Sequence, residues 1–273
     1  RGLGDVYKRH ELAAAKNKVA SIALRINPEV DAHTHAKITT GMKENKFGIN
    51  LSQLGGVLDK LKEMKNVKLI GIHSHIGSQI TDMSSFRNLV IRFNEIQEEL
   101  EAHGVTVENL NFGGGLGIDY YHPNHLSIPA FDNYFAAIHK LLQVRPGQQV
   151  HFEPGRSIVA QCGTLISKVL YVKEGETKKF AILDAGFTEL IRPAMYDAYH
   201  RIENISSDEA VETYDVVGPI CESSDVFGKD VELNKAHRGD LIALRSAGAY
   251  GEVMASQYNC RHLPKAYYSD TIK

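Results

Sequence analysis

The sequence has little cysteine, almost no net charge and no long apolar run. Its three cysteines, Cys162, Cys221 and Cys260, lie far apart, so they predict neither a disulfide framework nor a zinc ribbon and indicate a reducing, cytoplasmic compartment. Lysine and arginine number 31 against 33 aspartates and glutamates, which excludes the basic footprint of a typical nucleic-acid-binding protein. No apolar run approaches the roughly 18 residues of a membrane span. We therefore expect neither a nucleic-acid partner nor a membrane partner.

The composition is that of an ordinary globular protein. Of the 273 residues, 43% are apolar and 23% are charged, and a chain of this length commonly forms about two domains. The first residue is Arg1, and the first twenty residues contain neither a signal peptide nor a clear start of a domain. This start predicts that the sequence begins inside a longer protein.

The first half of the chain alternates between β-type and helical patterns. Apolar, β-rich runs begin near Ser21, Lys68, Val107 and Gln149, at intervals of about 40 residues, which is the length of a strand–helix unit. Helical periodicity follows at 51–64 and 86–104, and Gly104 stands where a glycine commonly ends a helix. Such βα units predict a parallel sheet.

Four such units lead up to Arg156, and polar residues follow each strand. These polar segments are Asn27, 73–79, 113–117 and 153–156, at the strand ends where parallel α/β folds place their active sites. A closed barrel of this kind needs eight units. We therefore expect residues 1–157 to be the cofactor-binding, C-terminal portion of a (β/α)8 barrel.

Residues 158–273 have a different pattern. Short runs rich in Val, Ile, Leu and Tyr alternate with turn signals, with one short helical segment from Arg192 to Tyr199. This predicts a mainly β second domain that contributes loops to the site, so that the fold class is α/β plus β.

Two motifs end strands of the first half. Gly113-Gly114-Gly115-Leu116-Gly117 allows backbone amides to approach an anion, as in a phosphate-binding loop, or forms a tight turn. Glu153-Pro154-Gly155-Arg156 places a carboxylate beside a guanidinium. That pair predicts either a ligand-binding site with a cation for an anionic group, or a structural salt bridge.

A third motif is His73-x-His75. Alternation of side chains along a strand puts both imidazoles on one face, which favours a zinc site if a further ligand is present. His33, His35, His122, His125 and His151 offer no recognisable companion motif. A packed or ring-stacking histidine at position 75 is therefore preferred, and no metal is expected.

Three further candidates lie in the second half. Cys221-Glu222 follows an apolar run and predicts proton transfer, although a lone cysteine is more often a small core residue. Tyr250 lies between glycines, where its hydroxyl could reach a ligand or simply form a turn. Arg192 and Tyr196 place a cation near a phenol, or begin a solvated helix.

Together these motifs resemble one family. The chain resembles the pyridoxal-phosphate-dependent decarboxylases of the alanine-racemase-like barrel fold and, within that group, the diaminopimelate decarboxylases. The segments that carry the resemblance, in order, are HIGSQI (75–80), GGGLGIDY (113–120), EPGR (153–156), DAGF (184–187), IRPAMY (191–196), GPICESSD (218–225) and SAGAYG (246–251). The stretch ITTGMKENKFGI (38–49) adds to it.

The resemblance implies decarboxylation of meso-2,6-diaminopimelate to L-lysine and CO₂, the last step of lysine biosynthesis. It implies pyridoxal phosphate as cofactor, with the protein supplying orientation and electrostatics. It also implies a homodimer with shared active sites, in which the CESSD loop reaches the neighbouring subunit's site.

The resemblance further implies a role for each candidate residue. Glu153 would contact the pyridine nitrogen, His75 would stack on the ring, and Cys221 would return a proton to the α-carbon. The groups implied for the cofactor phosphate are Gly113, Gly114, Gly115, Ser78, Gly155, Arg156 and Tyr250. Those implied for the substrate are Arg156, Arg192, Tyr196, Glu222 and Tyr250, with Glu222 facing the distal ammonium.

One family feature does not match. The lysine that holds the cofactor lies in a Tyr-Ala-x-Lys-Ala-like context in the family, and Lys8, in VYKRH, does not have that context. We expect the lysine to lie upstream and the 273-residue piece alone to be inactive and poorly folded. The alternatives are an ornithine, arginine or carboxynorspermidine decarboxylase of the same fold, an inactive regulatory homologue, and a metal-dependent amidohydrolase built on His73-x-His75.

Overall fold

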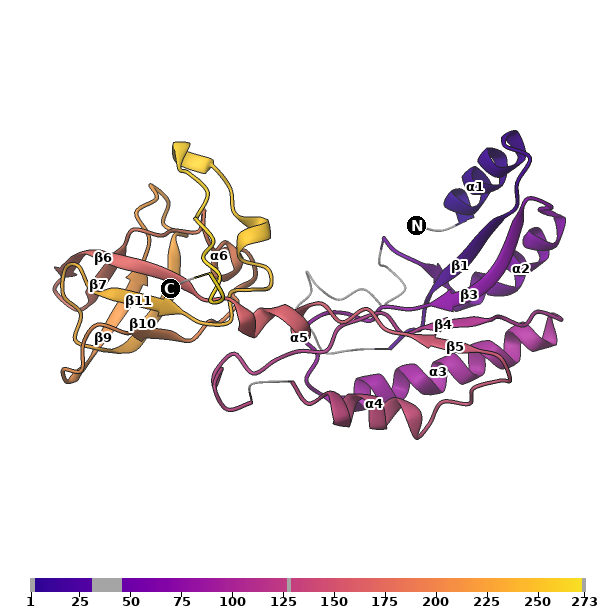
Figure 1. Ribbon diagram of the computed structural model, residues 1–273, viewed down its shortest axis with the longest axis horizontal. Helices are drawn as coiled ribbons and strands as arrows, with labels where there is room; N and C mark the ends of the chain where they lie inside the picture. Colours follow the sequence, from indigo (N-terminus) through magenta and orange to yellow (C-terminus); the bar gives the residue numbers. More distant parts are fainter. Residues whose placement is uncertain (1–2, 31–45, 127–128, 272–273) are drawn as a thin grey trace. The chain divides into compact units, whose positions relative to one another are not determined.

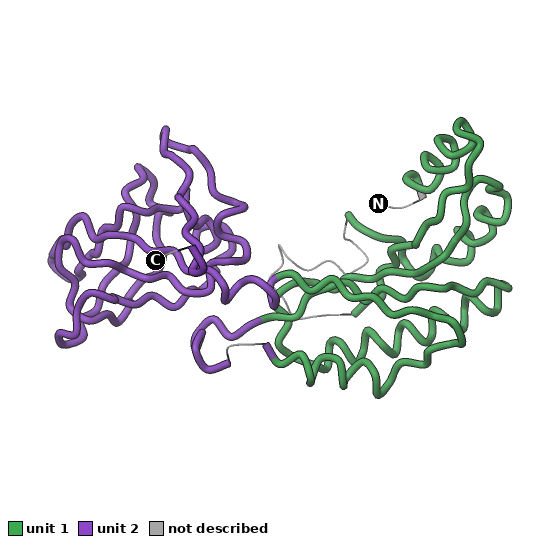
Figure 2. The backbone as a smooth tube through the Cα atoms, viewed as in Figure 1, with its two compact units in different colours: residues 1–117, 130–155 green, residues 118–129, 156–273 purple. Residues whose placement is uncertain are grey.

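The chain forms two compact units (Figure 2). The computed structural model describes residues 3–30, 46–126 and 129–271. One unit comprises residues 1–117 and 130–155, and the other comprises 118–129 and 156–273. The division after Gly155 lies two residues from the expected domain boundary, and the segment 118–129 groups with the second unit rather than the first. Residues 38–45 of the family-like stretch 38–49, with His33 and His35, lie outside the described residues.

The first unit contains a five-stranded parallel sheet in the order β2-β1-β3-β4-β5. Figure 1 labels β1, β3, β4 and β5 of this sheet. The four strands expected from the sequence are all present, which confirms the βα pattern. A two-residue strand, β2, was not expected and pairs with the end of β1. The bounds are β1 (Ala20–Asn27), β2 (Ile49–Asn50), β3 (Val67–His73), β4 (Asn109–Asn111) and β5 (Gln149–His151).

Helices connect these strands. They are α1 (Leu3–Ala15), α2 (Leu54–Glu63), preceded by a 3₁₀ turn η1 (Leu51–Gln53), α3 (Met83–Ala102) and α4 (Phe131–His139). The Asp82 carboxylate caps α3 by accepting the Ser84 N–H at 2.8 Å. At its other end Gly104 has φ +73°, and the N–H of Val105 bonds the Leu100 carbonyl. This left-handed glycine ending is the one that the sequence predicts.

The register of the sheet separates an apolar row from a polar row. Residues paired across parallel strands point to the same face, and their sequence neighbours point to the other. The apolar row is Leu24, Ile72, Leu110 and Val150, which packs in one core with α2, α3 and α4. The polar row is Arg25, His73, Asn111 and His151. The polar row therefore lies at the C-terminal ends of neighbouring strands, which is where the sequence predicts the site.

The second unit is mainly β, as expected. Its six-stranded sheet has the order β10-β9-β7-β6-β11-β8, and only the β7–β9 pair is parallel. Two strands, β8 and β10, were not expected. The bounds are β6 (Leu165–Glu174), β7 (Lys179–Leu183), β8 (Ile202–Asn204), β9 (Val211–Val217), β10 (Val226–Asn234) and β11 (Leu241–Leu244).

The second unit also contains short helices. They are α5 (Arg156–Val159), α6 (Arg192–Tyr196), η2 (Ala160–Cys162), η3 (Glu252–Met254) and η4 (Tyr258–Cys260). The helix expected from Arg192 to Tyr199 ends at Tyr196, because Asp197 adopts a left-handed conformation with φ +53°. Within the described ranges, no helix of either unit has the length and apolar character needed to cross a membrane.

Candidate active site

The residues predicted for the site fall in both units, so each unit is considered on its own. The first unit carries His75, Ser78, Gly113, Gly114, Gly115, Glu153 and Gly155. The second unit carries Arg156, Arg192, Tyr196, Cys221, Glu222 and Tyr250.

Glu153 is held in place at the end of the parallel sheet. Its Oε1 accepts a hydrogen bond from Asn111 Nδ2 at 2.9 Å, and His73 Nε2 lies 3.5 Å from its Oε2. The backbone N–H of Glu153 donates to the Gly113 carbonyl at 2.7 Å. The side chain remains 54% exposed. The carboxylate is therefore oriented by its neighbours and still accessible to a ligand.

The glycine loop packs closely against the same strand ends. Gly113 and Gly115 have φ values of +66° and +114°, which favour glycine. A Cβ at Gly114 would collide with the backbone carbonyl of Glu153. The Gly113 N–H donates to Asn111 Oδ1 at 2.8 Å, and the Gly114 N–H donates to His75 Nδ1 at 3.1 Å. The loop is thus fixed internally by two of its three amides.

His75 is a neutral imidazole. Its Nδ1 accepts the Gly114 N–H, so its proton resides on Nε2. Burial, together with the nearby charges of Arg25 and His73, lowers the pKa of His75 to about 4. Burial also lowers the pKa of His73. An uncharged ring at this position suits contact with the face of another ring.

Arg25 and Asn111 belong to this region but were not singled out from the sequence. Burial lowers the pKa of Arg25, and its guanidinium lies 4.8 Å from the centre of the Phe47 ring. Its Nε and Nη2 are buried and meet no hydrogen-bond acceptor among the described residues. The available signal was a charged side chain inside the apolar run ASIALRIN. Asn111 could have been noticed because it is a polar residue two positions before the glycine loop.

The histidine pair has no visible partners for a metal. Within the described ranges, no group of three His, Cys, Asp or Glu side chains could hold a metal ion. His75 Nδ1 is already engaged by a backbone amide. Zinc chemistry on His73-x-His75 therefore gains no support from these residues.

The first unit does fit pyridoxal phosphate. An oriented, accessible carboxylate can pair with a protonated pyridine nitrogen, and the uncharged His75 ring can lie against an aromatic ring. Among the three loop glycines, the Gly115 N–H is the amide with no acceptor within the described residues, and a backbone amide can bind a phosphate oxygen. This donor set matches the cofactor that the sequence motifs imply.

Two buried arginines share one phenol oxygen in the second unit. Arg156 and Arg192 are each 5% exposed. The Tyr120 hydroxyl oxygen accepts from Arg156 Nη1 at 2.6 Å and from Arg192 Nη1 at 3.1 Å. Burial lowers the pKa of Arg192, although nearby Tyr120 and Tyr196 oppose the shift. Arg192 begins α6 and Tyr196 ends it, so the expected cation and phenol are close together.

Arg192 also contacts His200, which was not predicted for the site. Arg192 Nη1 lies 2.9 Å from His200 Nε2, and His200 Nδ1 lies 2.9 Å from the Arg245 carbonyl. Across the part of the chain that the structure describes, Arg192 forms no ion pair with a carboxylate. Tyr120 could have been noticed at the end of GGGLGIDY, and His200 follows α6 by four residues.

Tyr250 lies over the other arginine. The guanidinium carbon of Arg156 is 5.2 Å from the centre of the Tyr250 ring, and Tyr250 is 37% exposed. A cation over an aromatic face is a favourable contact. The structure therefore joins Arg156, Arg192, Tyr120 and Tyr250 in one cluster.

Cys221 and Glu222 lie in an exposed loop. Glu222 Oε1 accepts a hydrogen bond from the Tyr258 hydroxyl at 2.7 Å. Asp225, which is 3% exposed, closes the loop by accepting the N–H groups of Ile220 at 2.7 Å and Phe187 at 2.6 Å. The thiol and the carboxylate are thus presented to solvent on a loop that a buried aspartate holds.

The loop and α6 line a common cavity of about 530 Å³. Pro193 and Ala194 of α6 contribute to its wall, together with Ser223 and Ser224 of the loop. The arrangement brings the helix that carries Arg192 and the loop that carries Cys221 to one hollow within the second unit.

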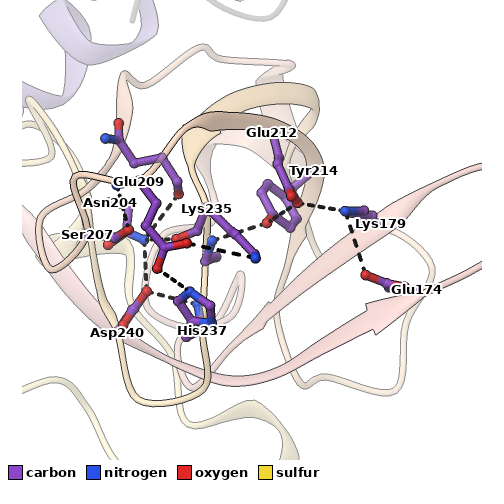
Figure 3. A network of polar contacts seen from close by, with 12 residues as sticks. Glu174, Lys179, Asn204, Ser207, Glu209, Glu212, Tyr214, Lys235, His237 and Asp240 are labelled. Carbon is purple, nitrogen blue, oxygen red and sulfur yellow. Dashed lines mark hydrogen bonds and ion pairs between the residues drawn. The ribbon is translucent and has the colours of Figure 1, made fainter.

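Another cavity of about 500 Å³ in this unit has a different character. Lys179 meets Glu212 at 2.7 Å, and the Tyr214 hydroxyl donates to the same carboxylate at 2.8 Å (Figure 3). In the adjoining part of the network, His237 Nε2 lies 2.8 Å from Glu209 Oε1. The two lysines that line this cavity, Lys178 and Lys179, each meet a carboxylate, so we do not assign an anionic ligand to it.

Comparisons with known proteins agree with the motifs. The family model described as "Pyridoxal-dependent decarboxylase, pyridoxal binding domain" matches residues 4–160. The chain is 66% identical to diaminopimelate decarboxylase of Bacteroides thetaiotaomicron, over 96% of this chain and 68% of that protein. It is 43% identical to that of Zymomonas mobilis, over 96% of this chain and 62% of that protein.

Solved structures give the same result. Diaminopimelate decarboxylase of Helicobacter pylori, complexed with L-lysine, matches 92% of this chain and 62% of that chain, with 40% identity and a TM-score of 0.83. A lysine decarboxylase of Selenomonas ruminantium has a TM-score of 0.80 at 21% identity, over 97% of this chain and 67% of that chain, which shows the fold alone. The chain thus spans about three fifths to two thirds of the length of these relatives. With the family model and these identities, the chain belongs to the pyridoxal-dependent decarboxylases, in the diaminopimelate decarboxylase family.

Proposed function

We propose that the protein removes CO₂ from the D-configured end of meso-2,6-diaminopimelate and forms L-lysine, as the last step of lysine biosynthesis. The observation that carries the substrate assignment is Arg192, a buried cation whose polar contacts among the described residues are a phenol oxygen and an imidazole nitrogen. A buried guanidinium without a carboxylate is unfavourable until an anion arrives. The distal carboxylate of diaminopimelate is an anion of the right kind.

Pyridoxal phosphate, when bound, supplies the electron sink for the electron pair left on the α-carbon after CO₂ departs. Glu153 would hold a proton on the ring nitrogen, because Asn111 and His73 orient its carboxylate. The neutral His75 ring would support the ring face. The Gly113–Gly115 loop, with Ser78, Gly155, Arg156 and Tyr250, would bind the phosphate.

The remaining step needs a proton at the α-carbon. Cys221 is an exposed thiol in the loop that Asp225 holds, and we assign it this role as the general acid. Glu222, beside it, keeps one carboxylate oxygen besides the one bonded to Tyr258, and we assign it the distal ammonium. Arg192 and Tyr196 would then bind the distal carboxylate, assisted by Arg156 and Tyr250.

Lysine release from meso-diaminopimelate, with added pyridoxal phosphate, tests the proposal on the intact protein that carries this sequence. Ornithine, arginine and carboxynorspermidine are assayed in parallel. We expect lysine from diaminopimelate and little turnover of the others, since ornithine and arginine offer Arg192 no distal carboxylate. Turnover of one of the others in its place would keep the cofactor and overturn the substrate. No turnover of any substrate would favour the inactive regulatory homologue.

We also infer a cytoplasmic homodimer with shared sites, which the family resemblance supports. Light scattering gives the mass in solution, and cell fractionation gives the compartment. Two inactive variants, E153Q and C221A, test the sharing, because they alter different units of the chain. If the CESSD loop serves the neighbouring subunit's site, mixing the two restores activity that neither has alone. A mixture without activity would contradict the sharing.

A further inference from the structure

Tyr120 and His200 are buried polar residues to which neither the motifs nor the proposed chemistry gives a role. They are 6% and 1% exposed, and their rings meet edge to face with centres 5.2 Å apart. Both contact Arg192, and Tyr120 also contacts Arg156. A side chain that is buried and bonded in this way restricts the rotamers of the groups it touches.

The Tyr120 hydroxyl oxygen is the hydrogen-bond acceptor that both arginines share. It accepts from Arg156 Nη1 and Arg192 Nη1, so its two lone pairs are used by the two cations. Both guanidinium carbons also lie near the face of its ring, at 5.9 Å for Arg156 and 5.2 Å for Arg192. Two like charges are thereby held close together by one neutral group.

Of the two arginines, Arg192 is the one that forms a hydrogen bond with His200. Because a guanidinium only donates, His200 Nε2 must accept from Arg192 Nη1, and His200 Nδ1–H must donate to the Arg245 carbonyl. This pair of bonds requires the neutral imidazole with its proton on Nδ1. The backbone carbonyl of Arg245, the residue after β11, thus fixes the imidazole, and the imidazole fixes the guanidinium.

We propose that Tyr120 and His200 are positioning residues that hold the two arginines ready for anions, Tyr120 serving both cations and His200 serving the substrate cation only. The inference rests on the proposed function for the identity of the substrate carboxylate. Orienting a long side chain before the ligand binds lowers the entropy lost on binding, so affinity rises without any new ligand contact. The two residues therefore determine how tightly the protein binds a substrate that has a distal carboxylate.

Because Tyr120 is proposed to position both arginines and His200 to position Arg192 only, two variants test the proposal. Y120F removes the shared oxygen and keeps the ring, whereas H200Q removes the fixed imidazole. Affinity for pimelate, the dicarboxylate that lacks amino groups, is measured by calorimetry. Affinity for pyridoxal phosphate is measured by its absorbance. Y267F is the matched control, because it removes the hydroxyl of a tyrosine that is 74% exposed.

We expect Y120F to weaken pimelate and pyridoxal phosphate each by about tenfold, the scale of one hydrogen bond to a charged group. H200Q should weaken pimelate by about tenfold and leave pyridoxal phosphate within about twofold. Both should raise KM for diaminopimelate while kcat changes by less than about threefold, because the lost binding is uniform. Y267F should match the parent protein.

Other outcomes overturn the proposal. If Y120F and H200Q bind pimelate as the parent does, even with a lowered melting temperature, the two residues are merely structural. If H200Q weakens both ligands equally, the separate role of His200 is wrong. If the parent binds pimelate and the variants weaken it as stated, but no substrate is decarboxylated, the proposed function fails while the positioning role stands.

Discussion

The second unit contains two clusters of charged side chains that differ in what neutralises them. In the network of Figure 3, Lys179 meets Glu212 and Glu174, and His237 meets Glu209. In the arginine cluster, Arg192 meets Tyr120 and His200, which are neutral. The first cluster is complete, since its cations meet carboxylates, while the second is incomplete, since Arg192 is held by neutral acceptors. The partners of a charge, and not its mere presence, are therefore the reason why we propose a ligand site at the second cluster and not at the first.

The largest effect is expected when the arginine of the incomplete cluster is removed. R192M should lower kcat/KM for diaminopimelate by about 10²- to 10³-fold, because an interaction with a desolvated charge is lost. Steady-state kinetics on the intact protein measure it. K179M, the matched change in the network of Figure 3, should alter kcat/KM by less than about twofold. Equal losses in the two variants would remove the distinction between the clusters.

A second expectation concerns how the stability of the folded protein changes at acid pH. Burial and nearby arginines lower the pKa of His200 to about 4, while an unfolded histidine titrates near 6.5. The unfolded chain therefore binds more protons between these values, and stability falls as the pH falls from about 6.5 to about 4. His200 accounts for about 3 kcal/mol of this loss in the free energy of unfolding.

Urea unfolding at a series of pH values measures this loss. H200Q should show a shallower fall of the unfolding free energy with acid than the parent protein does. H237Q changes an exposed histidine of the Figure 3 network and should keep the parent's slope. An unchanged slope in H200Q would contradict a neutral His200 in the folded protein.

A third expectation tests the buried aspartate that holds the Cys221 loop. Asp225 accepts two backbone N–H groups through its side chain, so D225A should lower the unfolding free energy by about 2 kcal/mol and slow the protonation step that we propose for Cys221. Urea midpoints and kcat measure the two effects. D225N, which keeps one acceptor oxygen, should lose less. Parent-like stability in D225A would show that the loop does not depend on Asp225.

The smallest effect is expected in the complete cluster. K179M combined with E212Q removes an ion pair whose lysine pKa is raised by its hydrogen bond to Glu212. Solvent screens such a pair, so the urea midpoint and kcat/KM should stay within error of the parent values. A large loss of activity would mean that this cavity, and not the arginine cluster alone, takes part in function.

The sequence predicted the elements that depend on local patterns. The strands of the first unit, the helix ending at Gly104 and the mainly β second unit follow from periodicity and glycine placement. Strand β8 was missed, since it pairs with β11 about 40 residues later. Strand β10 pairs with its sequence neighbour β9, and it was missed because Gly228 and Asp230 interrupt its apolar pattern.

The part of the candidate site that lies in short sequence motifs could be predicted from the sequence. Glu153, His75 and the glycine loop lie together as parallel strands require. Arg25, Tyr120 and His200 were not predicted, because their contacts join separate segments of the chain, such as those of Tyr120 and Arg192, which are 72 positions apart. No spacing rule connects such residues.

The grouping of residues 118–129 with the second unit has a consequence for any attempt to exchange or express the units as modules. The chain leaves the first unit after Gly117, returns to it at Ala130 and leaves it again after Gly155. A shortened chain beginning at Arg156 would keep both arginines and lose Tyr120. A chimera joined at a single crossover there would combine the arginines of one parent with the phenol of the other. Recombination between relatives would thus preserve the cluster only if two separated segments were inherited together.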